Sequence, residues 1–170
     1  MKNLFLGTAF ITLLGLSACE KPDEAAPATN SIKAESILDF ACLYNSADVP
    51  LKVSDAKKNI YGLWQLKGTI TMSPPAEEVP NLKIAISAVS ENKNLAEIYE
   101  NDKKKYSVNF SLVQKEYEKH LWVEIVPEKE TLDDGTYNFI KGTIRICEGE
   151  LMIDNGMAFD APAFLFRKTQ

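Results

Sequence analysis

The chain has few of the residues on which enzyme active sites are usually built. Its 170 residues include one histidine, three cysteines and eight glycines. No Gly-x-Ser-x-Gly segment and no glycine-rich phosphate loop occurs, and these are the patterns of serine hydrolases and of nucleotide-binding loops. We therefore predict no catalytic residues, no enzymatic activity and no cofactor.

Clustered positive charge is also scarce. The formal net charge is −5, and it becomes −6 when residues 1–18 are left out, because that stretch holds Lys2 and no acidic residue. Binding to nucleic acid needs clustered lysine and arginine. The one basic run, Lys103-Lys104-Lys105, is typical of a solvated turn. The composition therefore predicts no nucleic-acid partner.

The apolar run at the start of the chain is too short to cross a bilayer. It extends from Leu4 to Leu16, whereas a spanning helix needs about 20 apolar residues. Its length and the preceding Lys2 are typical of a signal peptide. The next stretch, Leu16-Ser17-Ala18-Cys19, resembles the lipobox of bacterial lipoprotein precursors. The resemblance implies removal of residues 1–18 and lipidation of Cys19.

A lipid anchor would decide where the rest of the chain resides. Two or more acyl chains give stable membrane attachment, whereas one binds only marginally. Glu20, and not aspartate, follows the anchor. In enterobacteria-like systems that resemblance favours the outer membrane, with the domain in the periplasm or at the cell surface. Residues 19–31 contain prolines and charges and predict a flexible tether, so residues 32–170 would form one domain.

Cys42 and Cys147 are the two cysteines left after lipidation. In an oxidising compartment disulfides persist, and a bond between these two would close a loop of about 105 residues. Two buried thiols or a metal pair are the alternatives. Zinc would need further cysteine or histidine ligands, so the sequence favours a Cys42–Cys147 disulfide and no metal site.

Hydrophobic periodicity predicts one N-terminal helix followed by strands. Apolar residues recur at helical spacing over 32–46, with a strand over 38–44 as the alternative. A short helical turn would follow, capped by Ser54 or Asp55. Alternation then predicts strands over 61–72, 82–88, 95–99, 106–112, 121–125, 138–146, 151–154 and 163–167, with Met157–Phe159 pairing across the turn Asn155-Gly156.

These elements predict a mainly β domain: an antiparallel barrel or sandwich of about eight strands with one N-terminal helix. Gly62-Leu63-Trp64 at the first strand resembles the Gly-x-Trp start of lipocalin-like (calycin) barrels. The resemblance implies that Arg167, late in the last strand, packs across Trp64 as a barrel-closing pair. The chain departs from true lipocalins because it is short after Trp64 and has its helix before the barrel.

The remaining polar groups predict surface chemistry only. His120 stands at a strand start among charged residues and is expected to be exposed. Five acidic residues lie close together in the sequence, as in a calcium-binding loop or in the paired carboxylates of glycoside hydrolases. Their spacing does not match an EF-hand loop, so solvated side chains are expected. This acidic group consists of Glu124, Glu128, Glu130, Asp133 and Asp134.

Two functions are compatible with these features. The first is a non-enzymatic protein-binding module of the envelope, such as an inhibitor, immunity or assembly factor, whose partner is an envelope or extracellular protein. The second is a carrier that holds a small apolar ligand inside a barrel lined by Trp64, Ile84, Phe110 and Ile144. The two differ in whether the interior is filled or hollow. The anchor and the lack of a catalytic set favour the first.

Overall fold

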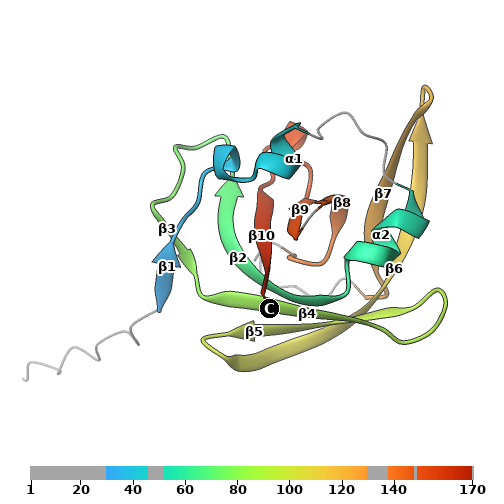
Figure 1. The fold of residues 1–170 in the computed structure, drawn as a ribbon, viewed down its shortest axis with the longest axis horizontal. Coiled ribbons are helices and arrows are strands. Elements are labelled where there is room, and N and C mark those ends of the chain that lie inside the picture. Colours follow the sequence, from blue (N-terminus) through green and yellow to red (C-terminus); the bar gives the residue numbers. More distant parts are fainter. Residues whose placement is uncertain (1–29, 46–51, 130–137, 148, 170) are drawn as a thin grey trace, which may run out of the picture.

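Eight antiparallel strands close into a barrel in a computed structural model that describes residues 30–45, 52–129, 138–147 and 149–169 (Figure 1). The strand order is β10-β2-β4-β5-β6-β7-β8-β9, and β9 pairs again with β10. The predicted barrel of eight strands is therefore confirmed over a sandwich. The strands are β2 (Gly62–Ile70), β4 (Leu82–Ala88), β5 (Asn94–Glu100), β6 (Lys103–Tyr117), β7 (His120–Pro127), β8 (Gly142–Cys147), β9 (Glu150–Asp154) and β10 (Ala163–Thr169).

Alternation along each strand places one set of side chains inside the barrel and the other outside. In β10, Phe164 and Phe166 belong to the large core inside the barrel, whereas Ala163 and Leu165 belong to a second buried cluster. The second cluster therefore lies on the outer face of the barrel. It is called the outer cluster below and consists of Phe40, Leu43, Met152, Ala163 and Leu165.

Helix α2 (Val53–Asn59) lies across one end of the barrel and contacts β6 and β8. Ala56 and Ile60 are fully buried in the barrel core, and the indole Nε1 of Trp64 donates a hydrogen bond to the carbonyl of Ile60 (2.7 Å). The predicted helical turn is confirmed, but the predicted caps Ser54 and Asp55 are wrong. The helix begins one residue earlier, after an extended Lys52 that supplies no side-chain cap.

The N-terminal segment is not the single helix predicted over 32–46. It consists of β1 (Ser31–Lys33), a 3-10 turn (Ile37–Asp39) and helix α1 (Ala41–Asn45). Ser36 and Asp39 form a capping box that starts the 3-10 turn, and Phe40 then leaves helical geometry with φ −95° and ψ 72°. Burial on the outer cluster selects Phe40 and Leu43 and leaves Leu38 and Tyr44 exposed, so tertiary contacts override the helical period.

A second, two-stranded sheet stands beside the barrel. β1 pairs antiparallel with β3 (Glu78–Pro80), which no alternation had predicted. The pairing places the start of the described chain next to the loop between β2 and β4 (Figure 1). This arrangement brings residues 34–37 against the end of β2, where the backbone N–H of Glu35 donates to the carbonyl of Lys67 (2.7 Å).

Three local boundaries differ from the sequence prediction. Lys103-Lys104-Lys105 begins strand β6, and the turn is formed by Asn101 and Asp102, whose φ values are 52° and 63°. After Asn155-Gly156, Met157–Phe159 forms a 3-10 turn, because the Asp154 carboxylate accepts the N–H groups of Gly156 and Met157 (2.8 and 2.7 Å). β9 therefore pairs with β10 on one side, in place of residues 157–159, and with β8 on the other. Residues 138–141 precede β8 and are not part of it.

Candidate functional site

The barrel interior is filled by side chains at the positions predicted to hold a ligand. Trp64, Ile84 and Phe110 have no exposed surface, and Ile144 is 1% exposed. A side chain without accessible surface has no water-sized space beside it, because close packing replaces solvent. These four residues therefore contact other core side chains and not a cavity.

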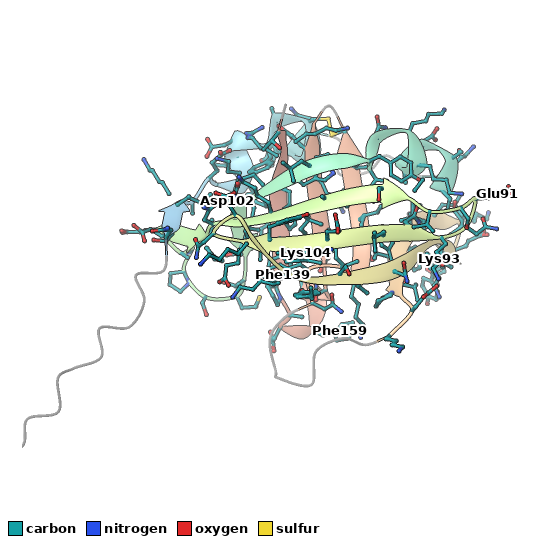
Figure 2. The ribbon with its side chains drawn as sticks, turned by 90° about the horizontal axis from the view of Figure 1, so that it is seen from below. Glu91, Lys93, Asp102, Lys104, Phe139 and Phe159 are labelled. Atoms are coloured by element: carbon teal, nitrogen blue, oxygen red, sulfur yellow. A yellow bond between two sulfur atoms is a disulfide. The ribbon has the colours of Figure 1, made fainter. Side chains whose placement is uncertain are left out.

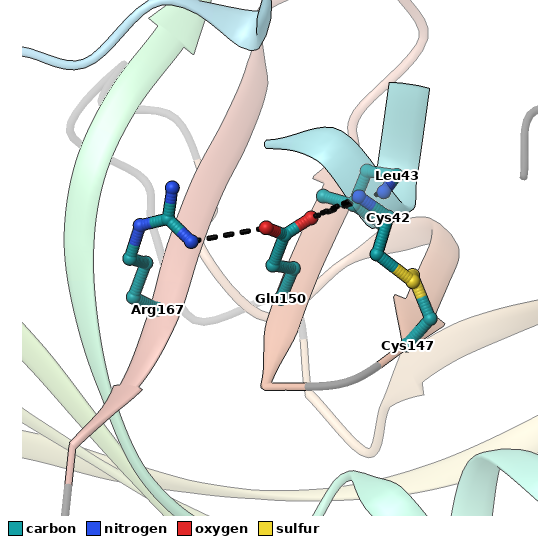
Figure 3. The surroundings of a disulfide bond; sticks show 5 residues. All are labelled: Cys42, Leu43, Cys147, Glu150 and Arg167. Carbon is teal, nitrogen blue, oxygen red and sulfur yellow. Dashed lines mark hydrogen bonds and ion pairs between the residues drawn. A yellow bond between two sulfur atoms is a disulfide. The ribbon is translucent and has the colours of Figure 1, made fainter. Parts of the chain in front are cut away.

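The predicted disulfide between Cys42 and Cys147 is confirmed (Figure 3). It joins α1 to the end of β8, with a Cα–Cα distance of 6.1 Å, which is within the usual range for a disulfide. The bond fastens the N-terminal segment to the barrel next to the outer cluster, where Cys147 itself packs. The disulfide thus lies at the boundary between the outer cluster and the surface.

A buried carboxylate connects the same segment to the last strand. One oxygen of Glu150 accepts the backbone N–H groups of Cys42 and Leu43 (3.1 and 3.0 Å), at the start of α1. The other oxygen accepts from Arg167 Nη1 at 3.0 Å (Figure 3). Glu150 is only 7% exposed, so these contacts replace the water that a carboxylate would otherwise bind.

Arg167 holds three parts of the chain together. Its Nε pairs with Glu35 (2.7 Å), and its Nη2 donates to the carbonyl of Asp39 (2.6 Å). Burial by itself would lower the pKa of the Arg167 guanidinium, but the hydrogen bonds with Glu35 and Glu150 outweigh burial and raise that pKa. Arg167 therefore stays charged and serves to position the N-terminal segment.

The predicted pair of Trp64 and Arg167 is wrong. Arg167 lies over the ring of Phe40, 4.4 Å from its centroid, and Lys168 is the cation near Trp64, with Nζ 5.4 Å from the ring centroid. The register explains the difference, because Lys168 is opposite Trp64 across the β10–β2 pairing and Arg167 is opposite Gln65. Neighbouring residues on a strand point to opposite faces. Arg167 consequently faces the outer cluster.

Cys42, Cys147 and Glu150 are close enough to suggest a metal centre. Their potential ligand atoms lie within 4.8 Å of one another. Both sulfur atoms are bonded to each other, however, and both oxygens of Glu150 accept hydrogen bonds. Because metal binding by cysteine requires a thiolate, the oxidised arrangement does not fit a metal ion.

An open pocket of about 310 Å³ lies outside the barrel, between the N-terminal segment and the β2–β3 loop. Residues 34–37 form one wall, and residues 69–71, 73 and 75–77 form the others. Gly68 allows the walls to approach, because a Cβ at this position would lie 2.5 Å from the carbonyl oxygen of Glu35. The sequence did not predict this pocket, since β1 and β3 are too short to show alternation.

Of the charged residues considered in the sequence, His120 and Glu128 are exposed as expected, whereas Glu124 is half-buried. His120 is exposed at the tip of the β6–β7 hairpin. Glu124 accepts the indole N–H of Trp122 (2.8 Å). Glu128 pairs with Lys93 (2.8 Å), whose hydrogen bond lowers the pKa of Glu128. Glu130, Asp133 and Asp134 lie outside the described residues.

Two of the three lysines at the start of β6 form ion pairs with acidic neighbours. Lys104 forms a hydrogen-bonded ion pair with Glu97, which lowers the pKa of Glu97 and raises that of Lys104. Lys105 pairs with Glu100 at 2.7 Å. Figure 2 shows Lys104 on the strands between the two ends of the barrel, with Asp102 toward one end and Glu91 and Lys93 toward the other. A continuous basic surface does not form at these positions.

Comparison of the chain with protein-family models, with curated proteins and with solved structures finds no match. Among the helices that the structure describes, none is long and apolar enough to span a bilayer. Cys19 and the rest of the predicted lipobox lie outside the described residues. The function therefore has to be argued from the chemistry of the sequence and the surface of the barrel.

Proposed function

We propose that this chain is a lipid-anchored protein of the bacterial cell envelope that binds another protein and catalyses no reaction. In this proposal Cys19 carries the lipid, the residues between Cys19 and β1 (Ser31–Lys33) act as a tether, and the outer membrane is the site of attachment. The domain would stand in the periplasm or at the cell surface. Its partner would be an envelope or extracellular protein.

The packed interior is the observation that most supports binding through the outer surface. An interior carrier would need an apolar cavity of several hundred Å³, whereas Trp64, Ile84 and Phe110 have no accessible surface at all. The lipobox resemblance supports the anchor. The disulfide is in keeping with an oxidising compartment.

Capture of a partner tests the binding proposal. The domain from residue 20 onward, exported by an ordinary cleaved signal peptide, would be immobilised and exposed to solubilised envelopes. We expect one retained protein that excess free domain displaces. Native mass spectrometry of the exported domain tests the alternative function as a carrier. Release of a bound apolar molecule of several hundred daltons would overturn the protein-binding proposal.

Detergent-phase partitioning tests the anchor. We expect the full chain to enter the detergent phase and the Cys19→Ser variant to lose the lipid-dependent mass and remain unprocessed by lipoprotein maturation. The matched control is the double variant Cys42→Ser with Cys147→Ser, which keeps the lipid-bearing cysteine. An identical mature mass for wild type and Cys19→Ser would refute lipidation at Cys19.

A further inference from the structure

We propose that the pocket between the N-terminal segment and the β2–β3 loop receives a lysine or arginine side chain of the partner protein. This inference rests on the proposed protein-binding function and names the chemistry of one contact. The pocket measures about 310 Å³, at the lower limit of volumes that hold a drug-sized ligand. A volume of that order suits a single long side chain better than a lipid.

Backbone hydrogen bonds join the N-terminal segment to both other walls of the pocket. The N–H of Ala34 donates to the carbonyl of Glu77 (2.9 Å), and the N–H of Glu35 donates to the carbonyl of Lys67 (2.7 Å). The N-terminal segment is therefore fixed on one side to the loop and on the other side to β2. Because both contacts use main-chain atoms, the pocket is formed before a partner arrives, which reduces the ordering cost of binding.

The charge of the lining favours a cation. Two carboxylate residues, Glu35 and Glu77, line the pocket, and the lining includes no lysine or arginine. Glu35 is already engaged by Arg167 (2.7 Å) and lies 3.9 Å from Lys67. Among the residues that the structure describes, Glu77 is exposed and takes part in no ion pair. Glu77 is therefore the carboxylate that can pair with an incoming positive group.

The rest of the lining matches the stem of the same side chain. Ile37, Ile70 and Pro75 provide apolar surface, and lysine and arginine bury their methylene stems on such surface while the charged end stays near polar groups. Thr69 and Ser73 add polar atoms to the lining. A combination of apolar wall, hydroxyl groups and an available carboxylate distinguishes this pocket from a simple acidic patch.

Two short peptides that differ only in charge test the proposal. The probes are acetyl-Gly-Lys-Gly-amide and its norleucine counterpart, titrated into the ¹⁵N-labelled domain from residue 20 onward. We expect the lysine peptide to cause saturable shifts at residues 34–37 and 69–77, and the norleucine peptide to bind about fivefold more weakly, the upper end for an exposed ion pair. Equal binding of both peptides would overturn the proposal, because charge would then have no role.

Two variants place the contact at the pocket. Glu77→Gln should weaken the lysine peptide about fivefold and leave the norleucine peptide unchanged. Glu116→Gln, which removes an exposed carboxylate from the β6–β7 hairpin, should change neither peptide. Ala76→Phe should abolish the shifts by filling the pocket, and a thermal melt would verify its folding. Equal weakening by Glu77→Gln and Glu116→Gln would indicate general attraction to acidic surface and would refute the site.

The same variants separate this inference from the binding proposal. If wild type captures a partner and the Glu77→Gln and Ala76→Phe variants capture it equally well, the partner binds elsewhere and only the pocket assignment fails. If wild type captures no partner, the protein-binding function itself fails. Loss of capture by both pocket variants, with capture retained by Glu116→Gln, is the expected result.

Discussion

Removal of the Cys42–Cys147 bond should destabilise the domain mainly by loosening the unfolded chain. The two cysteines are 105 residues apart, and the chain-entropy model gives about 4.7 kcal/mol for a loop near that length. The predicted domain, residues 32–170, has 139 residues. For a domain of about that size, a loss of about 4.7 kcal/mol would lower the melting temperature by about 10 to 20 °C. The variant to compare with wild type is Cys42→Ala with Cys147→Ala.

The folded state should change little in this variant, because other contacts hold the same segment. Phe40 and Leu43 remain buried in the outer cluster, and Glu150 still accepts the N–H groups of Cys42 and Leu43. The backbone donors survive a change of side chain. The cross-link therefore acts on the unfolded state, and its removal should also steepen the dependence of unfolding free energy on urea, since the unfolded chain exposes more surface.

Urea unfolding followed by tryptophan fluorescence measures both effects. Trp64 is fully buried and reports loss of the core. A decrease of unfolding free energy of less than about 1 kcal/mol would refute the loop-closure reasoning, as would an unchanged urea dependence with a large decrease. The latter would mean that the bond stabilises the folded barrel directly. Wild type reduced with dithiothreitol should behave like the variant.

Three further outcomes are expected. Glu150→Ala should lower the unfolding free energy by about 3 kcal/mol in urea unfolding, because buried donors at α1 lose a charged acceptor; a loss below about 1 kcal/mol would contradict this. Gly68→Ala should cost about 1 to 3 kcal/mol, since its Cβ meets the Glu35 carbonyl; a neutral effect would show that the segment yields easily. Lys104→Met should raise the lowered pKa of Glu97 toward its ordinary value in a carbon-13 titration. An unchanged pKa of Glu97 in the Lys104→Met variant would refute the pairing. Because a carboxyl whose pKa is lowered in the folded state contributes stability above its unfolded pKa of about 4.3, this contribution should be lost as the pH falls through the folded-state pKa.

Much of the barrel could be read from alternation in the sequence. Strands such as β4 and β7 have one face buried in the core and one toward solvent, so their period of two is visible without any partner. The disulfide followed from a count of cysteines once Cys19 was assigned to lipid. β1 and β3 could not be predicted, because strands of three residues are too short to display a period.

The sequence by itself indicated, through alternation, which residues lie inside the barrel, and it favoured a bond between Cys42 and Cys147, which the structure confirms. Tertiary structure decided the partners of its polar groups, since these depend on how strands far apart in the chain are aligned. The β10–β2 register places Lys168 opposite Trp64 and turns Arg167 to the outer face. There Arg167 meets Glu35 and Glu150, which the sequence did not single out. A shift of one residue in register exchanges the two faces of a strand, and local sequence alone cannot set that shift.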